Sequence, residues 1–281
     1  MIPPTRKGRP GDRAQPPKLP VKMPKDPKFR LSAVIPLRDR PAKHLDAALG
    51  FLAAQRLPME EVIVVDQASR AKFRQRYAKV CARRGSRNFP VRHVLRSGPP
   101  KWNKPMAANF GIRSTSEKAT HVLSMDCDML FAPHAAETFR SLSLGSETDL
   151  LVIGHRHDLV DPDRVLKQAA PWSTLERASR LTDRVAHPWH FASREWFFKI
   201  RGYDERMWGR GAMDTDLSAR AERDNDVTVV RLREQQILAV HYSHGRPPWE
   251  QTRKKPETIL NRRLRNTDES IVRNDETWGT T

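Results

Sequence analysis

Two aspartates in the middle of the chain, Asp126 and Asp128, follow directly on an apolar run at residues 121–125. Two carboxylates behind a buried strand are costly unless a cation compensates their charge. Because the chain turns where a strand ends, both side chains can converge on one hard divalent ion, and oxygen ligands suit Mg²⁺ or Mn²⁺. A solvated acidic turn would carry the same pair, so the surrounding elements must distinguish the two interpretations.

The elements around this pair alternate between short apolar runs and helical periods. Strands are predicted at residues 31–35, 62–65, 91–95, 121–125, 150–153, 227–232 and 237–242, and helices at 44–55, 73–83, 105–113, 172–184 and 214–223. A strand-helix-strand order predicts a parallel pair with a right-handed crossover and ligands at the carboxyl ends of the strands. The predicted fold class is α/β, with a Rossmann-like mixed sheet flanked by helices.

The chain is strongly basic, and the distribution of its charge predicts three parts. Its 281 residues include 51 Lys and Arg against 33 Asp and Glu, a net charge of +18. Residues 1–30 hold nine basic residues, two acidic residues and eight prolines. We expect a disordered basic tail there, because so little apolar surface cannot offset the entropy of ordering. Residues 31–245 carry +9 and form the predicted globular domain, and residues 246–281 carry +2 and form a partly ordered extension.

Composition excludes several classes of protein. No run approaches the roughly 18 consecutive apolar residues of a membrane-spanning helix, and no apolar segment follows the charged N-terminus as in a signal peptide. Two cysteines, Cys81 and Cys127, are too few for a disulfide framework and lack the spacing of a zinc site. We therefore expect a cytoplasmic protein without a membrane span.

The ends of the first two predicted strands resemble those of family 2 glycosyltransferases with the GT-A fold. Ile35-Pro36 closes the first strand and Val65-Asp66-Gln67-Ala68-Ser69 closes the second, similar to "VIIP" and "VVDDGS" in that family. The resemblance spans roughly residues 31–245 and implies a pocket for a nucleotide-diphosphate sugar. It implies that the nucleotide contacts are Pro36, Arg38, Asp66, Lys104, Asn109 and Asp126, and that the metal ligands are Asp126, Asp128 and His241.

A second segment is similar to the C-terminal motif of galactosyltransferase-type enzymes, "GyDE" followed by "fWGwGgEDtDl". It begins at Gly202-Tyr203-Asp204-Glu205 and continues at Trp208-Gly209-Arg210-Gly211-Ala212-Met213-Asp214-Thr215-Asp216-Leu217, with Met213 in the place of the usual Glu. The resemblance implies that Asp214 is the catalytic base for the acceptor hydroxyl. It also implies sugar contacts, for which the candidates are Trp208, Gly211, Asp216 and, unless they belong to the core, Trp189 and His190.

These features predict a metal-dependent glycosyltransferase, either a hexosyltransferase or an N-acetylhexosaminyltransferase. The expected donor is a nucleotide-diphosphate sugar, with UDP as the favoured nucleotide, and the expected acceptor is a hydroxyl of a glycan, a protein or another molecule. The expected cofactor is Mn²⁺ or Mg²⁺, for which His244 is a further candidate ligand beside His241. The galactosyltransferase-type loop favours inversion at the anomeric carbon.

The basic composition leaves two alternatives open. A sequence pI near 10.5 and the basic tail are compatible with a nucleic-acid-binding protein, although no helix-turn-helix or RNA-binding signature is present. A transferase whose acceptor is a nucleic acid or an anionic protein would combine both interpretations. In either case the tail is the expected contact to a polyanion.

Overall fold

The computed structural model describes residues 29–99, 101–167, 171–183, 186–209, 211–244 and 256–280. The predicted tail lies outside these residues except for its last two positions, and Arg210 also lies outside them. No helix within the described ranges is long and apolar enough to cross a bilayer.

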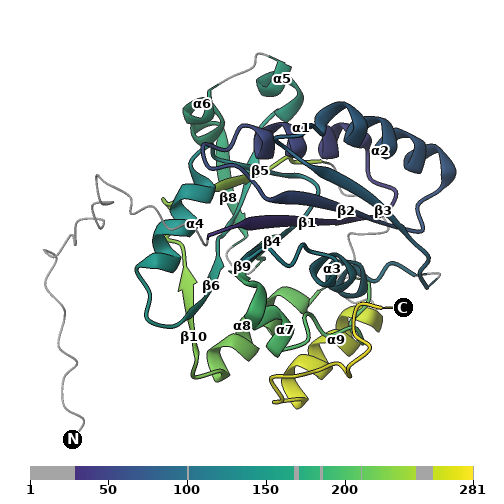
Figure 1. Ribbon diagram of the computed structural model, residues 1–281, viewed down its shortest axis with the longest axis vertical. Coiled ribbons are helices and arrows are strands. Elements are labelled where there is room, and N and C mark those ends of the chain that lie inside the picture. The colour runs from purple at the N-terminus through teal and green to yellow at the C-terminus, as the bar shows by residue number, and fades with distance from the viewer. Residues whose placement is uncertain are drawn as a thin grey trace, which may run out of the picture.

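A seven-stranded mixed sheet forms the centre of the molecule (Figure 1). Its strands, in spatial order, are β10 (Val227–Arg231), β6 (Asp149–Ile153), β9 (Trp189–Ser193), β4 (His121–Met125), β1 (Leu31–Leu37), β2 (Glu61–Gln67) and β3 (Val91–Arg96). Strand β1 pairs in parallel with β2 and β4, which confirms the predicted parallel pair. Strand β9 runs antiparallel to β4 and β6, so the sheet is mixed.

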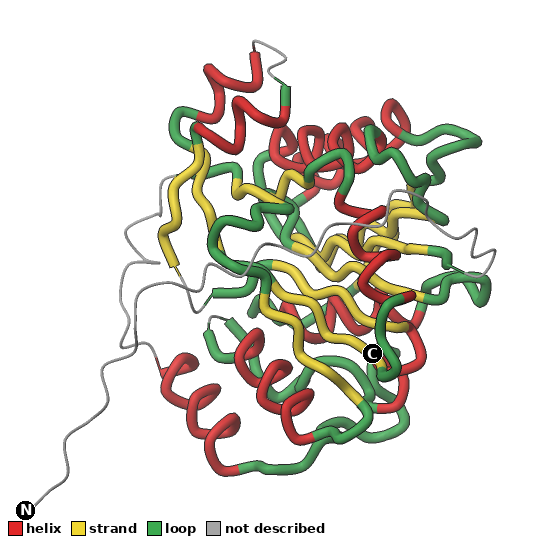
Figure 2. Tube along the Cα trace, turned by 90° about the vertical axis from the view of Figure 1, so that its left-hand side faces the viewer, coloured by secondary structure: helices red, strands yellow, loops and turns green. Residues whose placement is uncertain are grey.

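Helices cover both faces of this sheet, because its central strands are apolar on both sides. One face packs against α1 (Ala42–Ala53), α2 (Ala71–Arg84) and α4 (Ala135–Leu144). The other packs against α3 (Lys104–Arg113), α7 (Arg194–Lys199) and α8 (Met213–Arg223). Figure 2 shows the strands in yellow between helices on either side. The α/β fold class predicted from the sequence is confirmed.

A smaller sheet contains three strands that the periodicity did not indicate, together with β11 (Ala239–His241), which lies within the strand predicted at residues 237–242. Its strands, in spatial order, are β5 (Met129–Phe131), β11, β7 (Arg156–Leu159) and β8 (Ser179–Asp183), beside the short helices α5 (Pro162–Lys167) and α6 (Trp172–Arg177). The helix predicted at 172–184 is therefore wrong beyond residue 177. There the chain pairs with β7 in an antiparallel ladder, and this tertiary partner outweighs local helical preference.

The C-terminal residues pack against the face of the molecule that carries α3, α7 and α8. Helix α9 (Pro256–Thr267) contacts α8, and Leu264 packs against the same apolar cluster as Leu217. The Trp278 ring is buried there and meets Phe198 edge to face. Segment 256–280 thus belongs to the structural support of the domain, and the site described below depends on it.

Candidate functional site

The carboxyl end of β4 brings one aspartate beside two histidines. Asp128 lies between β4 and β5, and β11 pairs antiparallel with β5, placing His241 opposite Met129. The Oδ2 atom of Asp128 lies 3.6 Å from Nε2 of His241 and 3.2 Å from Nε2 of His244. Donor atoms of Asp128, His241 and His244, which we call the Asp-His-His cluster, all lie within 4.8 Å of one another. One carboxylate and two imidazoles in this arrangement form a donor set suited to a divalent ion.

A second carboxylate orients one of the imidazoles. His241 Nδ1 lies 2.8 Å from Asp158 Oδ1, and the Arg156 guanidinium holds Asp158 with hydrogen bonds of 2.7 and 3.0 Å. This contact turns Nε2 of His241 toward Asp128. Burial lowers the pKa of His241, but Asp128 and Asp158 outweigh it and raise the pKa to about 9. Burial likewise opposes ionisation of Asp128, yet the two histidines hold its pKa well below the usual range.

The side chain of Lys104 lies between a carboxylate at the end of β4 and one at the start of α8. Its ammonium lies 2.6 Å from Asp126 Oδ1 and 3.9 Å from Asp214 Oδ1. Burial lowers the pKa of Lys104, but the two carboxylates outweigh it and keep the amine protonated. The sequence prediction made Asp126 a metal ligand, whereas the structure pairs it with Lys104 and leaves it outside the Asp-His-His cluster.

Asp214 lies in the first turn of α8 without acting as its cap. Ala212 occupies the N-cap position with φ of 68°, and no side chain caps the helix there. Burial raises the pKa of Asp214 to about 6, although the Lys104 charge opposes this. Its Oδ1 atom is buried and accepts no hydrogen bond from the described residues. Such a carboxylate can accept a proton near neutral pH.

Three predicted sugar contacts are buried instead. Asp216 is 1% exposed and lies between Arg220, at 3.0 Å, and Arg273, at 3.2 Å. The Trp189 ring is buried edge-on against Phe131. The His190 ring is also buried and lies 3.0 Å from the Tyr203 hydroxyl. Asp216, Trp189 and His190 therefore pack inside the domain in this structure, and their sugar contacts stay predictions that no exposed side-chain face supports.

The side chain of Asn109 forms hydrogen bonds with the loop that precedes Trp208. Its Oδ1 accepts a 2.7 Å hydrogen bond from the Tyr203 amide, and its Nδ2 donates to Tyr203 O and to Glu205 Oε1. The loop passes so close that a Cβ on Gly202 would lie 2.1 Å from Asn109 Oδ1. Asn109 is buried and its amide is bonded to this loop, so it supports the loop, and its nucleotide contact stays a prediction.

The ends of β1 and β2 bring together the predicted base contacts. Pro36 is paired with Val65, one register position from Asp66. Asp66 is buried, its Oδ1 accepts a hydrogen bond from Ser69 N, and its Oδ2 accepts none from the described residues. Arg38 donates to the carbonyl of Pro99 at 3.2 Å. These residues lie at the carboxyl ends of adjacent parallel strands, the usual ligand-binding edge of such sheets.

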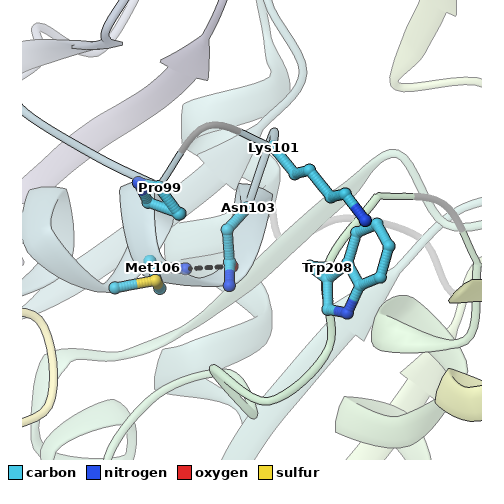
Figure 3. Close-up of a pocket in the computed structure, with 5 residues that line it drawn as sticks. All are labelled: Pro99, Lys101, Asn103, Met106 and Trp208. Atoms are coloured by element: carbon cyan, nitrogen blue, oxygen red, sulfur yellow. Dashed lines mark hydrogen bonds between the residues drawn. The ribbon is translucent and has the colours of Figure 1, made fainter.

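A cavity of about 480 Å³ lies beside the N-terminus of α3. Figure 3 shows the residues that line it, Pro99, Lys101, Asn103, Met106 and Trp208. The Lys101 ammonium lies 4.1 Å from the centre of the Trp208 ring. Gln67 Oε1 accepts a hydrogen bond from Asn103 N, so Gln67 supports this wall.

Residues missed from the sequence hold these groups in place. Asn261 on α9 donates to the carbonyls of Trp208 and Gly211, at 2.9 and 3.0 Å. Arg273 and Asp158 likewise support Asp216 and His241. No motif marks these side chains, since each acts through a contact between distant segments.

No protein-family model and no curated protein matches this chain. Among solved structures it is similar to the mannosyltransferase PcManGT from Pyrobaculum calidifontis in complex with GDP-Man and Mn²⁺, at 17% identity and a TM-score of 0.55 over 79% of this chain and 59% of that one. It is also similar to S. aureus TarS 1-349 in complex with UDP-GlcNAc, at 14% identity and a TM-score of 0.55 over 84% of this chain and 65% of that one. A mycobacterial protein matches at 16% identity and a TM-score of 0.55 over 84% of this chain and 74% of that one.

These similarities define the fold. The chain has the GT-A fold of nucleotide-sugar transferases, and it spans about 60% of the length of the mannosyltransferase chain. At such low identity the comparison concerns the architecture, and the chemistry depends on the residues described above.

Replacing Asp216 tests its role as a buried support. Asp216→Asn removes the carboxylate that pairs with the buried Arg220 and one of the two carboxylates that pair with Arg273, so the free energy of unfolding should fall by about 3–5 kcal/mol. Chemical denaturation followed by tryptophan fluorescence measures the loss.

The control is Asp226→Asn, because Asp226 is 81% exposed and pairs with Lys199 at the surface. That exposed pair should contribute less than about 1 kcal/mol. Equal effects of the two substitutions would contradict the structural role of Asp216.

Proposed function

We propose that this protein is a divalent-metal-dependent glycosyltransferase that moves a sugar from a nucleotide-diphosphate sugar to an acceptor hydroxyl. The observation that carries the proposal is the chain of contacts at one sheet edge. The Asp-His-His cluster begins two residues after Asp126, which Lys104 joins to Asp214. The Asp-His-His cluster, which can ligate a metal, and Asp214, a carboxylate with a pKa near 6, thus both lie beside the strand ends. This edge is where α/β sheets of this kind bind their ligands.

Asp128, His241 and His244 would hold the metal. They fit the ion because their donor atoms already converge and Asp128 Oδ1 is buried without a hydrogen bond from the described residues. The ion would neutralise charge that develops on the leaving diphosphate. Mn²⁺ is the favoured ion on two grounds: imidazole is a softer ligand than Mg²⁺ prefers, and the similar mannosyltransferase was solved with Mn²⁺.

Asp214 would act as the general base. It takes the proton of the acceptor hydroxyl as that oxygen attacks the anomeric carbon, and attack opposite the leaving group inverts the centre. The ammonium of Lys104 keeps Asp214 ionised and neutralises Asp126 beside it. Desolvation makes the carboxylate a stronger base than an exposed aspartate.

The donor would occupy the edge between β1, β2 and α3. Asp66 Oδ2 would accept a base N–H, with Pro36 and Arg38 beside it, and the TarS complex with UDP-GlcNAc supports a UDP sugar of the hexose or N-acetylhexosamine class. Trp208, with Gly211 in the same loop, would contact a sugar face from the cavity wall.

Turnover of nucleotide sugars tests the proposal. Purified protein with Mn²⁺ should release nucleoside diphosphate from at least one member of a panel of UDP and GDP sugars. Asp214→Asn should lower kcat for transfer by about 10²–10⁴-fold because the base is lost. Asp128→Asn should lower turnover and weaken metal binding, and the exposed Asp226→Asn should change neither. If Asp214→Asn and Asp128→Asn both retained wild-type turnover, the proposed glycosyltransferase activity would be refuted.

The pH dependence of transfer follows from the pKa of Asp214, which burial raises to about 6. The base works only when ionised, so kcat should rise through pH 6 and level off above it. Lys104→Met removes the positive charge that lowers this pKa, so the rising limb should move to higher pH. Steady-state rates measured from pH 4.5 to pH 9 check the shift, and an unmoved limb would contradict the role of Lys104.

Metal affinity depends on the carboxylate behind His241. Asp158→Ala frees the ring of His241 from its hydrogen bond, and Mn²⁺ should bind about 10–100-fold more weakly. Titration calorimetry or the free-Mn²⁺ electron paramagnetic resonance signal measures this directly. Asp161→Asn serves as the control, because Asp161 pairs with Arg164 at the surface. An unchanged affinity in Asp158→Ala would contradict the orienting contact.

A further inference from the structure

The basic charge of the folded domain is concentrated in one segment. Residues 67–116 contain 13 Lys and Arg and no Asp or Glu. The whole of residues 31–245 carries only +9, so the remainder of the domain is net acidic by four charges. This segment forms α2, β3 and α3, on the β3 side of the sheet (Figure 1). This segment therefore supplies the positive excess of the folded domain.

Within this segment, α2 presents its cations in a line. Lys72, Arg76, Lys79 and Arg83 follow one another at spacings of four, three and four residues, and all four are exposed. This spacing places them on one face of a helix, over about 16 Å of its axis. The opposite face is buried through Tyr77, because it packs against the sheet. We call these four side chains the α2 cation row.

Some cations in and beside the α2 cation row already have carboxylate partners. Arg70 pairs with Asp39, and Arg83 and Arg84 both pair with Asp46. Lys72, Arg76 and Lys79 form no ion pair with any described residue. Three adjacent positive charges are thus left to solvent or to an external anion.

The surroundings of the row restrict the kind of anion. Its exposed neighbours on α2 are Ala71, Arg74, Gln75, Ala78 and Ala82. No large apolar side chain is exposed on this helix, so it lacks the apolar face that inserts into a membrane surface. The buried Tyr77 and the half-buried Phe73, with Lys72 over its ring, leave no open aromatic face for stacking bases.

We propose that the α2 cation row is a docking surface for a linear phosphate polymer, recognised by the charge of its backbone. A line of cations complements a line of phosphates, and both Arg and Lys bind phosphate oxygens with charge-assisted hydrogen bonds. The helix begins beside Arg70, three residues beyond the carboxyl end of β2, so the bound polymer passes the edge that holds Asp66. The surface functions without donor or metal and is independent of the proposed transferase activity.

The experiment compares two variants of the full-length chain that each lose three positive charges. The test variant carries Lys72→Gln, Arg76→Gln and Lys79→Gln. The control variant carries Lys118→Gln, Arg180→Gln and Arg223→Gln, three exposed cations outside this segment. The basic first 28 residues are the same in both proteins, so their contribution cancels. Fluorescence anisotropy with end-labelled inorganic polyphosphate, without added divalent metal, measures binding at several salt concentrations.

The wild type and the control variant should bind polyphosphate with the same dependence on salt. Each lost phosphate contact lowers the slope of log K against log salt by about 0.7 for a single strand, so the test variant should lose about 2 from the slope. A fourfold rise in salt then weakens wild-type binding about sixteen-fold more than binding by the test variant. Equal slopes in the wild type and the test variant, or equal losses in the two variants, would overturn the proposal.

Two further probes distinguish the class of partner. Oligo(dT) of equal charge should bind with the same slope and within a few-fold of the affinity for polyphosphate. Binding at least tenfold tighter would show that bases are read and would overturn backbone recognition. Binding confined to vesicles of phosphatidylcholine and phosphatidylglycerol would assign the row to a membrane surface and would equally overturn it. Matching thermal unfolding of the three proteins confirms that they are folded.

Discussion

The contact on which the site depends is the pairing of one half-buried ammonium with two carboxylates. Asp126 ends the β4 segment and Asp214 begins α8, and the Lys104 ammonium lies between them. Without it, two nearby negative charges would face each other in a poorly solvated edge of the sheet. The same ammonium holds three elements in register, because Lys104 is the first residue of α3. The same contact therefore balances the charges at this edge and fixes the positions of the three elements.

The C-terminal segment extends this constraint to the loop that carries Trp208. Asn261 donates to two carbonyls of the loop, and Arg273 neutralises Asp216, which lies in the first turn of α8 with Asp214. Ala212 in this loop has a left-handed backbone and no side chain caps α8 there, so the external partners stabilise this strained geometry. The catalytic loop of the proposed enzyme is thus held by residues about 50 positions further along the chain.

Local patterns made the sheet and its helices predictable, since buried parallel strands are continuous apolar runs. The strands from β1 to β4 and helices α1 to α3 lie close to their predicted ranges. Apart from β11, the strands of the smaller sheet were not predictable, because strands such as β7 and β8 are short and polar and are stable only as partners. The same limit applied to side chains. Asp216 and Trp189 stand within or beside recognisable segments, but only packing shows that they are buried.

The sequence by itself determined the α/β architecture and the region of the site, because periodicity and strand ends are properties of neighbouring residues. It also indicated Asp128, Asp214 and His241. Only the tertiary structure decided which side chains contact one another at the site. It placed His244, a further candidate from the sequence, in one cluster with His241, paired Asp126 with Lys104 and buried Asp216. These outcomes depend on burial and on distances between segments far apart in the chain, which a linear pattern does not contain.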